Sequence, residues 1–139
     1  MTSTYAHADL YAEVQHFYAR QMQLLDARKL EAYADTFTAD AEFAHTPGRE
    51  PARTRPGILR DLHAVHERFE GDPQQRRHLF TMIDIEPTPE GPIRSTCYAL
   101  IVTTRPGAGP ELVRSCVVHD VLVREDGELR NRSRQVEHD

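Results

Sequence analysis

The chain has 139 residues and a mass of 15.9 kDa, the size of one domain that buries roughly two thirds of the surface of its unfolded form. Its 17 basic and 22 acidic side chains give a formal charge of -5, which argues against nucleic acid and anionic membranes as partners. No stretch approaches the run of about 18 apolar residues of a membrane span, and the N-terminus lacks the layout of a signal peptide. We therefore expect one cytoplasmic domain over residues 1–139.

The first half of the chain has the spacing of helices. Over residues 9–29 apolar side chains recur at steps of three and four, which predicts an amphipathic helix with Asp9 as its N-cap. A break at residues 26–29 predicts a tight turn. A shorter apolar stripe after this turn indicates a second helix, with Leu30, Tyr33 and Phe37 on one face.

A third helix is predicted over residues 54–70, after a turn and a short strand over residues 38–45. Pro56 in the first turn and Gly71 after the last turn are its start and stop signals. Its apolar stripe consists of Ile58, Leu62, Val65 and Phe69.

From Arg76 onwards the period changes to two, and Val, Ile, Thr and Tyr become frequent. Turn signals rich in Pro and Gly separate four predicted strands, over residues 76–87, 93–105, 111–126 and 128–138. Helices followed by an antiparallel meander predict an α+β fold, with three N-terminal helices packed on a curved, mostly antiparallel sheet that encloses a pocket.

The alternation along the predicted strands selects the side chains that can face this pocket. His78 shares a face with Phe80 and Met82. The opposite face of this strand is also apolar, which suggests that it packs against a second copy of the chain in a homodimer. His119 and Asp120 are neighbours on one strand, so they point to opposite faces and cannot pair directly.

Other reactive side chains have structural interpretations. Cys97 and Cys116 lie in apolar alternating stretches without metal-site spacing and are expected to be buried free thiols. His63, His66 and Glu67 do not match known zinc-hydrolase motifs, so we expect a solvated helix face and no metal. Three arginines that alternate along the last strand are expected to form one solvated or interface ladder: Arg130, Arg132 and Arg134.

Three stretches of the chain, in this order, resemble the nuclear transport factor 2-like superfamily: LLDARKLEAYADTFTADAEFAH, RRHLFTMIDIEP and VLVREDGELRNRSRQVEHD. Within it the chain is similar to the SnoaL-like polyketide cyclase and dehydratase group, and also to the β subunits of aromatic-ring-hydroxylating dioxygenases. The resemblance covers nearly the whole chain and implies a cone-shaped α+β barrel. For function it is less specific, because one scaffold carries many activities in this superfamily.

The resemblance to scytalone-dehydratase-like members implies catalytic roles for Asp26, His45 and His78. Asp26 falls on a catalytic aspartate, His45 on a pocket tyrosine and His78 on a pocket histidine. The chain departs from that pattern at Leu25, where the group has a tyrosine. It also lacks a counterpart of the second catalytic histidine, so a related acid/base reaction is expected instead of the same dehydration.

A carboxylate and an imidazole in an apolar pocket can exchange a proton with a carbon next to a carbonyl, without a cofactor. The residues expected to bind the substrate, with the tyrosines as hydrogen-bond donors, are Tyr18, Tyr33, Phe80, Met82 and Tyr98. Each catalytic candidate also has a structural interpretation. Asp26 can form the turn between the first two helices, His78 can be a core histidine paired with Asp26, and His45 can be exposed at a strand end.

Two classes of function are therefore open. The first is a cofactor-independent cyclase, dehydratase or isomerase acting on an aromatic polyketide or a similar hydrophobic carbonyl compound. The second is a non-catalytic partner such as a dioxygenase β subunit, or a protein that binds a small ligand without chemistry. The chain is shorter than we expect for such subunits, which favours the enzyme.

Overall fold

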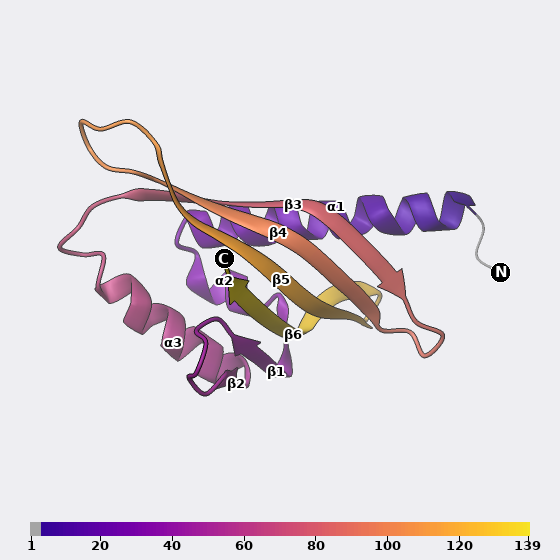
Figure 1. Ribbon diagram of the computed structural model, residues 1–139. Helices are drawn as coiled ribbons and strands as arrows, with labels where there is room; N and C mark the ends of the chain where they lie inside the picture. Colours follow the sequence, from indigo (N-terminus) through magenta and orange to yellow (C-terminus); the bar gives the residue numbers. More distant parts are fainter. Residues whose placement is uncertain (1–3) are drawn as a thin grey trace.

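The computed structural model describes residues 4–139. The N-terminus that was assessed above for a signal peptide includes residues 1–3, which lie outside the described residues. Three helices lie against one curved sheet (Figure 1). In chain order the elements are α1 (Thr4–Asp26), α2 (Leu30–Ala34), β1 (Phe37–Ala44), β2 (Ala52–Arg53), α3 (Arg55–Glu67), β3 (Gln75–Pro87), β4 (Ile93–Thr104), β5 (Glu111–Glu125) and β6 (Glu128–His138).

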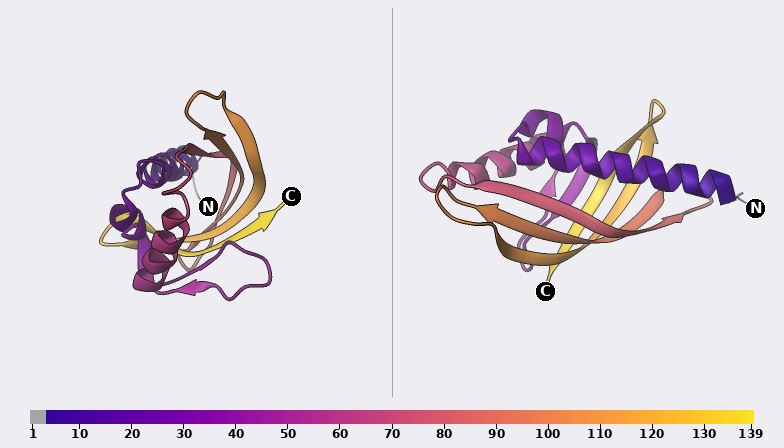
Figure 2. Two further views of the ribbon diagram at one scale, coloured as in Figure 1. Left: turned by 90° about the vertical axis from the view of Figure 1, so that its left-hand side faces the viewer. Right: turned by 90° about the horizontal axis from the view of Figure 1, so that it is seen from above.

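The six strands form one sheet in the order β2-β1-β6-β5-β4-β3. Strands β1 and β6 are parallel, and all other neighbours are antiparallel. Figure 2 shows the sheet curling around the helices, with β2 and β3 as its two edges. The predicted α+β fold is therefore confirmed, as an open and cone-like sheet.

Helix α1 forms because its apolar side chains repeat at helical spacing and face the sheet. Val14, Tyr18, Met22 and Leu25 are all buried. The helix begins at Thr4, so Asp9 lies inside it and is not the N-cap that the sequence predicted. It ends at Asp26, and Arg28 takes a positive φ of 59° in the tight turn that follows.

The second helix is shorter than its apolar stripe predicted. Helix α2 ends at Ala34, and Phe37 is the first residue of β1, where it pairs with Asn131 of β6. Helix α3 begins as predicted, because the hydroxyl of Thr54 accepts a hydrogen bond from the amide of Gly57 at 3.2 Å.

A bulge in β3 changes which of its side chains face the helices. Thr81 pairs with Tyr98 and Asp84 with Thr96, so β3 contains one residue more than β4 over this stretch. Met82, with a φ of 53°, lies in the bulge. His78 and Phe80 precede the bulge and face inward, whereas Ile83 and Ile85 are the buried side chains after it.

A second bulge lies in β6. Val121 of β5 pairs with Ser133, but its neighbour Leu122 pairs with Asn131, which leaves Arg132 as the extra residue. Leu129 and Asn131 are buried before this bulge, and Arg134 is buried after it. The extra residue therefore turns Arg134 toward the core.

The outer face of the sheet keeps several apolar side chains in contact with solvent, among them Leu79, Tyr98 and Leu112. The homodimer expected from the sequence stays a prediction, and these side chains are the ones that it would cover.

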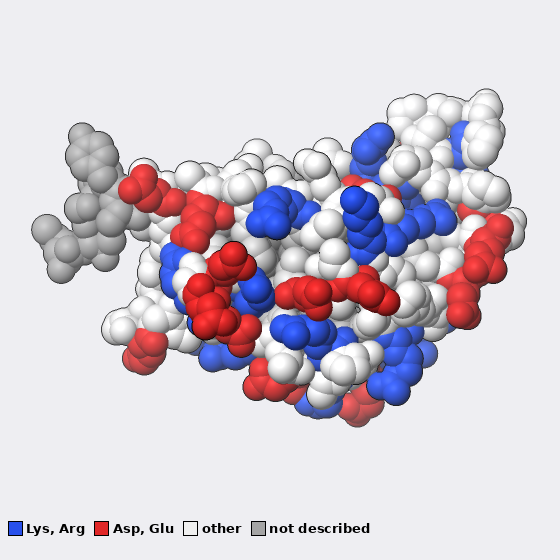
Figure 3. Space-filling view, turned by 180° about the vertical axis from the view of Figure 1, so that it is seen from behind, with Lys and Arg blue, Asp and Glu red and all other residues white. Residues whose placement is uncertain are grey.

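Within residues 4–139, no helix is long and apolar enough to cross a membrane. Figure 3 shows that acidic and basic side chains are interspersed on the face opposite to that of Figure 1.

Candidate active site

A cavity of about 230 Å³ lies between the helices and the inner face of the sheet. Its wall is mostly apolar, with side chains such as Met22 of α1, Ile58 of α3 and Phe80 of β3. The cavity is also lined by several titratable groups, among them Asp26, His45, Asp61, His66 and His78. An apolar cavity with few polar groups is the usual form of a small-molecule site.

Asp26 and His78 form a hydrogen-bonded pair in the wall of this cavity. Nδ1 of His78 lies 2.7 Å from Oδ1 of Asp26, and the backbone amide of His78 donates to Oδ2 at 3.2 Å. Asp26 is the last residue of α1, and His78 lies on the inner face of β3. Their side chains are only 12% and 16% exposed, so the pair is largely shielded from bulk water.

This geometry decides which nitrogen of His78 can reach a ligand. Both oxygens of Asp26 accept hydrogen bonds from His78, which holds the ring proton on Nδ1. Among the side chains of residues 7–139, Nε2 has no hydrogen-bond partner. In the neutral ring Nε2 is therefore a free proton acceptor, and Asp26 can stabilise the ring once it is charged.

His45 belongs to a second carboxylate and imidazole pair, with Asp61 of α3. Its Nε2 lies 2.7 Å from Oδ2 of Asp61, and its Nδ1 lies 3.0 Å from the hydroxyl of Thr46. The side chains of His45 and Asp61 are 36% and 46% exposed, so this pair lies closer to solvent than Asp26 and His78. At this end of the cavity Nε2 of His138 donates to the carbonyl oxygen of His45 at 2.9 Å.

The three residues predicted to be catalytic thus all line one cavity, but as members of two different pairs. Sequence reasoning missed Asp61 because helix faces are rich in carboxylates. The sequence feature that could have identified Asp61 is its position three residues after Ile58, which places it beside the apolar stripe of α3. The catalytic roles themselves stay predictions.

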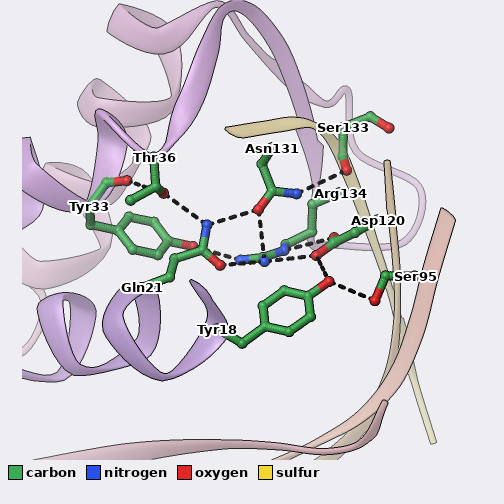
Figure 4. A network of polar contacts seen from close by, with 9 residues as sticks. All are labelled: Tyr18, Gln21, Tyr33, Thr36, Ser95, Asp120, Asn131, Ser133 and Arg134. Atoms are coloured by element: carbon green, nitrogen blue, oxygen red, sulfur yellow. Dashed lines mark hydrogen bonds and ion pairs between the residues drawn. The ribbon is translucent and has the colours of Figure 1, made fainter. Parts of the chain in front are cut away.

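A buried polar network surrounds the guanidinium of Arg134 beside the cavity (Figure 4). Arg134 donates through Nε and Nη2 to the two oxygens of Asp120, both at 2.9 Å. It also donates to Oε1 of Gln21 at 2.7 Å and to the hydroxyl of Tyr33 at 3.1 Å. These bonds join α1, α2, β5 and β6, so the network fixes the helices against the sheet.

Arg134 corrects the prediction that three arginines of the last strand form a solvated ladder. It is 3% exposed, whereas Arg132 is exposed and Arg130 is half-buried. Burial alone would lower the pKa of Arg134, but Asp120 and Tyr33 raise it above its ordinary value. The guanidinium therefore stays charged, and Asp120 is its counter-ion.

Of the three tyrosines predicted to bind substrate, Tyr18 and Tyr33 are buried, but their surroundings differ. Tyr33 lines the cavity, and burial raises the pKa of its hydroxyl. Tyr18 is not part of the cavity wall, and its hydroxyl donates into the polar network, 2.7 Å from Asp120 and 2.8 Å from Ser95. Burial, followed by the charge of Asp120, raises the pKa of Tyr18. We therefore assign Tyr18 to the core and keep Tyr33 as a ligand-binding candidate.

The expectation that Met82 and Tyr98 line the pocket is wrong. Met82 is 73% exposed because the bulge in β3 turns it away from the inner face, and Tyr98 is 54% exposed on the outer face of β4. Phe80 does line the cavity, as predicted, and its ring packs against Tyr18 at 5.3 Å between centroids.

His119, Asp120 and the two cysteines have the surroundings that the sequence predicted. His119 is exposed and lies 3.6 Å from Glu137, whereas Asp120 is buried. Cys97 and Cys116 are buried free thiols. Among the described residues, no three His, Cys, Asp or Glu side chains gather as metal ligands would.

His66 was expected on a solvated helix face, but it lines the cavity. Its Nδ1 lies 2.9 Å from the carbonyl oxygen of Leu62. Burial lowers the pKa of His66, which favours its neutral form.

Comparison with known proteins adds to this geometry. The model of the SnoaL-like domain family matches residues 6–135. ActVI-ORFA from Streptomyces coelicolor is 47% identical, with a TM-score of 0.89 over 94% of this chain and 98% of that one. A Catenulispora acidiphila structure in complex with S-DNPA is 51% identical, with a TM-score of 0.86 over 94% of each chain.

Aln2 from a Streptomyces species is 35% identical, with a TM-score of 0.87 over 99% of this chain and 94% of that chain. None of the curated proteins that were compared matches this chain. The family match spans nearly the whole sequence, and the similar structures share the fold at substantial identity. The chain therefore belongs to the SnoaL-like domain family.

Proposed function

We propose that this protein is a cofactor-independent tailoring enzyme that acts on an aromatic polyketide or a similar hydrophobic carbonyl compound. The observation that carries the proposal is the pair of Asp26 and His78, which leaves Nε2 of His78 free in an apolar cavity. The membership of the SnoaL-like family and the similarity to ActVI-ORFA support the substrate class. A relative that is 51% identical has a structure in complex with S-DNPA, which supports the binding of a small molecule by this protein.

In the proposed reaction Nε2 of His78 removes a proton from the carbon next to the carbonyl. The electrons of the broken C–H bond form a C=C bond, and the carbonyl oxygen becomes an enolate. Asp26 is a positioning residue that holds the ring and stabilises its positive charge. Return of the proton from His78 to another atom of the substrate gives isomerisation. Attack of the enolate carbon on a second carbonyl gives ring closure, and the oxygen of that carbonyl takes the proton from His78. Cleavage of the C–O bond of a β-hydroxyl group gives dehydration, because this group leaves as water with the proton from His78.

Tyr33 is the proposed donor to the enolate oxygen. Its hydroxyl accepts a hydrogen bond from Arg134, and none of the other side chains in residues 7–139 accepts the proton of this hydroxyl. A donor polarised by a cation suits an oxygen that gains negative charge in the transition state. Tyr33→Phe should therefore lower kcat with little change in KM.

The proposal is tested with 2-tetralone, a bicyclic ketone, by following in D₂O the loss of its α-proton signals by NMR. We expect the protein to accelerate this exchange, and His78→Ala to reduce the acceleration on the order of a hundredfold or more. Asp26→Asn should cause a similar loss and should also change the pH profile, because the ring would lose its orienting carboxylate. His63→Ala is the matched control, since His63 is exposed and lies outside the cavity wall.

Equal exchange rates in the protein and in His78→Ala would remove His78 from the mechanism. Binding of the ketone without any acceleration would favour the alternative of a ligand-binding protein without chemistry. The other alternative, a β-subunit-like partner of a dioxygenase, predicts that the isolated chain accelerates nothing and is stable only with a large iron-bearing chain.

A further inference from the structure

Three arginines from separate parts of the chain line the cavity beside His78. Arg28 lies in the turn after α1, Arg76 near the start of β3, and Arg114 near the start of β5. The sheet register places Arg114 level with His78, because both pair with Ile101 of the intervening strand β4. Arg76 lies two residues before His78, on the same face of β3. We call Arg28, Arg76 and Arg114 the arginine cluster.

The arginine cluster has no carboxylate partner of its own. None of the ion pairs among the described side chains includes a member of it. Arg28 donates to the carbonyl oxygen of Gln74 at 3.0 Å, and Arg76 lies over the ring of Phe69 at 4.9 Å. The charge of Asp26 does act on Arg76, but both oxygens of Asp26 are already bonded to His78.

Arg76 also differs from the other arginines that are not exposed in the hydrogen bonds that its guanidinium donates. Arg55, Arg130 and Arg134 each donate at least one hydrogen bond to a protein oxygen. No such bond involves the guanidinium of Arg76 within the part of the chain that the structure describes. This holds in a chain with more acidic than basic side chains, where carboxylates are available to pair with cations elsewhere.

This arrangement costs stability unless an anion is bound. Burial lowers the pKa of Arg76, and the charges of Arg114 and Arg28 lower it further. Arg76 is half-buried, whereas Arg28 and Arg114 are exposed at the rim of the cavity. A half-buried cation with two further cations beside it and no carboxylate partner of its own marks a site prepared for a negative ligand. Arginine is suited to a carboxylate, because its planar group donates two parallel hydrogen bonds to it.

We propose that the arginine cluster binds a carboxylate group of the substrate, so that the substrate is a hydrophobic carbonyl compound that carries an acid. Arg76 and His78 are two residues apart on one face of β3, which separates them by about 7 Å along the strand. In the proposed complex the carboxylate and the carbon that His78 deprotonates are therefore separated by about the length of one fused ring system. This inference depends on the proposed function only for the cavity being the substrate site.

The test compares 2-naphthoate with its neutral isostere 2-naphthamide by isothermal titration calorimetry at pH 7.5 and low ionic strength. We expect the protein to bind 2-naphthoate at least about tenfold more tightly, which corresponds to about 1.4 kcal/mol. Arg76→Gln should abolish this preference, and Arg76→Lys should retain part of it. Arg77→Gln is the matched control, because it removes the same charge from the next residue, which is exposed on the opposite face of β3.

Equal affinities of the unmodified protein for the two compounds would overturn the proposal, and so would equal losses in Arg76→Gln and Arg77→Gln. Tighter binding of 2-naphthyl phosphate than of 2-naphthoate would show that the arginine cluster prefers a phosphate group. It would overturn the proposal that the cluster binds a carboxylate. His78→Ala separates this inference from the proposed catalysis. It should keep the preference for 2-naphthoate while losing the exchange of 2-tetralone.

Discussion

Replacing Asp120 with alanine should lower the free energy of unfolding by about 3–5 kcal/mol, because it leaves a buried cation without its counter-ion. The carboxylate of Asp120 accepts two hydrogen bonds from Arg134 at 2.9 Å and one from Tyr18 at 2.7 Å. The side chains of Arg134 and Asp120 are 2% and 0% exposed, so water cannot replace the lost partner. A hydrogen bond to a charged group contributes about 1.5–3 kcal/mol, so the two bonds from Arg134 are enough to account for a loss of about 3–5 kcal/mol.

The measurement is urea unfolding at pH 7, followed by circular dichroism. The matched control is Glu13→Ala, which breaks an ion pair of the same two-bond form with Arg124, at 2.6 and 2.7 Å, on the surface. Those side chains are 40% and 46% exposed, and their pair should contribute only about 0–1 kcal/mol. When Arg134 is already replaced with Met, replacing Asp120 with alanine should lower the free energy of unfolding much less, because the buried cation is gone.

An Asp120→Ala variant that lost no more stability than Glu13→Ala would refute this reasoning. An equal cost of losing Asp120 with and without Arg134 would refute it as well, because the penalty would then not arise from the unpaired guanidinium.

Two further predictions concern a buried thiol and a strained backbone. Burial raises the pKa of Cys97 from 9.0 to about 12, so above pH 9 the folded state keeps a proton that the unfolded state loses, and stability falls as pH rises. Denaturant unfolding should show that this thiol lowers the free energy of unfolding by about 1 kcal/mol between pH 9 and pH 10. Cys97→Ala should remove this part of the pH dependence. An equal pH dependence in Cys97→Ala would contradict a raised pKa of Cys97. Met82 is exposed and has a positive φ of 53°, so Met82→Gly should leave the unfolding free energy equal or raise it by up to about 1 kcal/mol. Leu79→Gly, an exposed position of β3 without a positive φ, should lower it by at least about 1 kcal/mol, and equal losses in both variants would argue against strain at Met82.

Part of the candidate site could be predicted from the sequence because it depends on short-range spacing. His78 alternates with Phe80 on β3, so strand spacing predicted it at the pocket. Asp26, at the end of α1, was expected there from the resemblance to scytalone-dehydratase-like members. The arginine cluster carries no such signal. Its members are far apart in the sequence, and only the sheet register and the turn after α1 place them together.

The sequence by itself determined the order of helices and strands, because periods of 3.6 and 2 are properties of neighbouring residues. The tertiary structure alone decided which face each strand presents after its bulge. One extra residue reverses the alternation, so Met82 is exposed and Arg134 is buried against the sequence prediction. The burial of Arg134 also needs Asp120 and Gln21 from other elements, and this compensation arises only when the chain is folded.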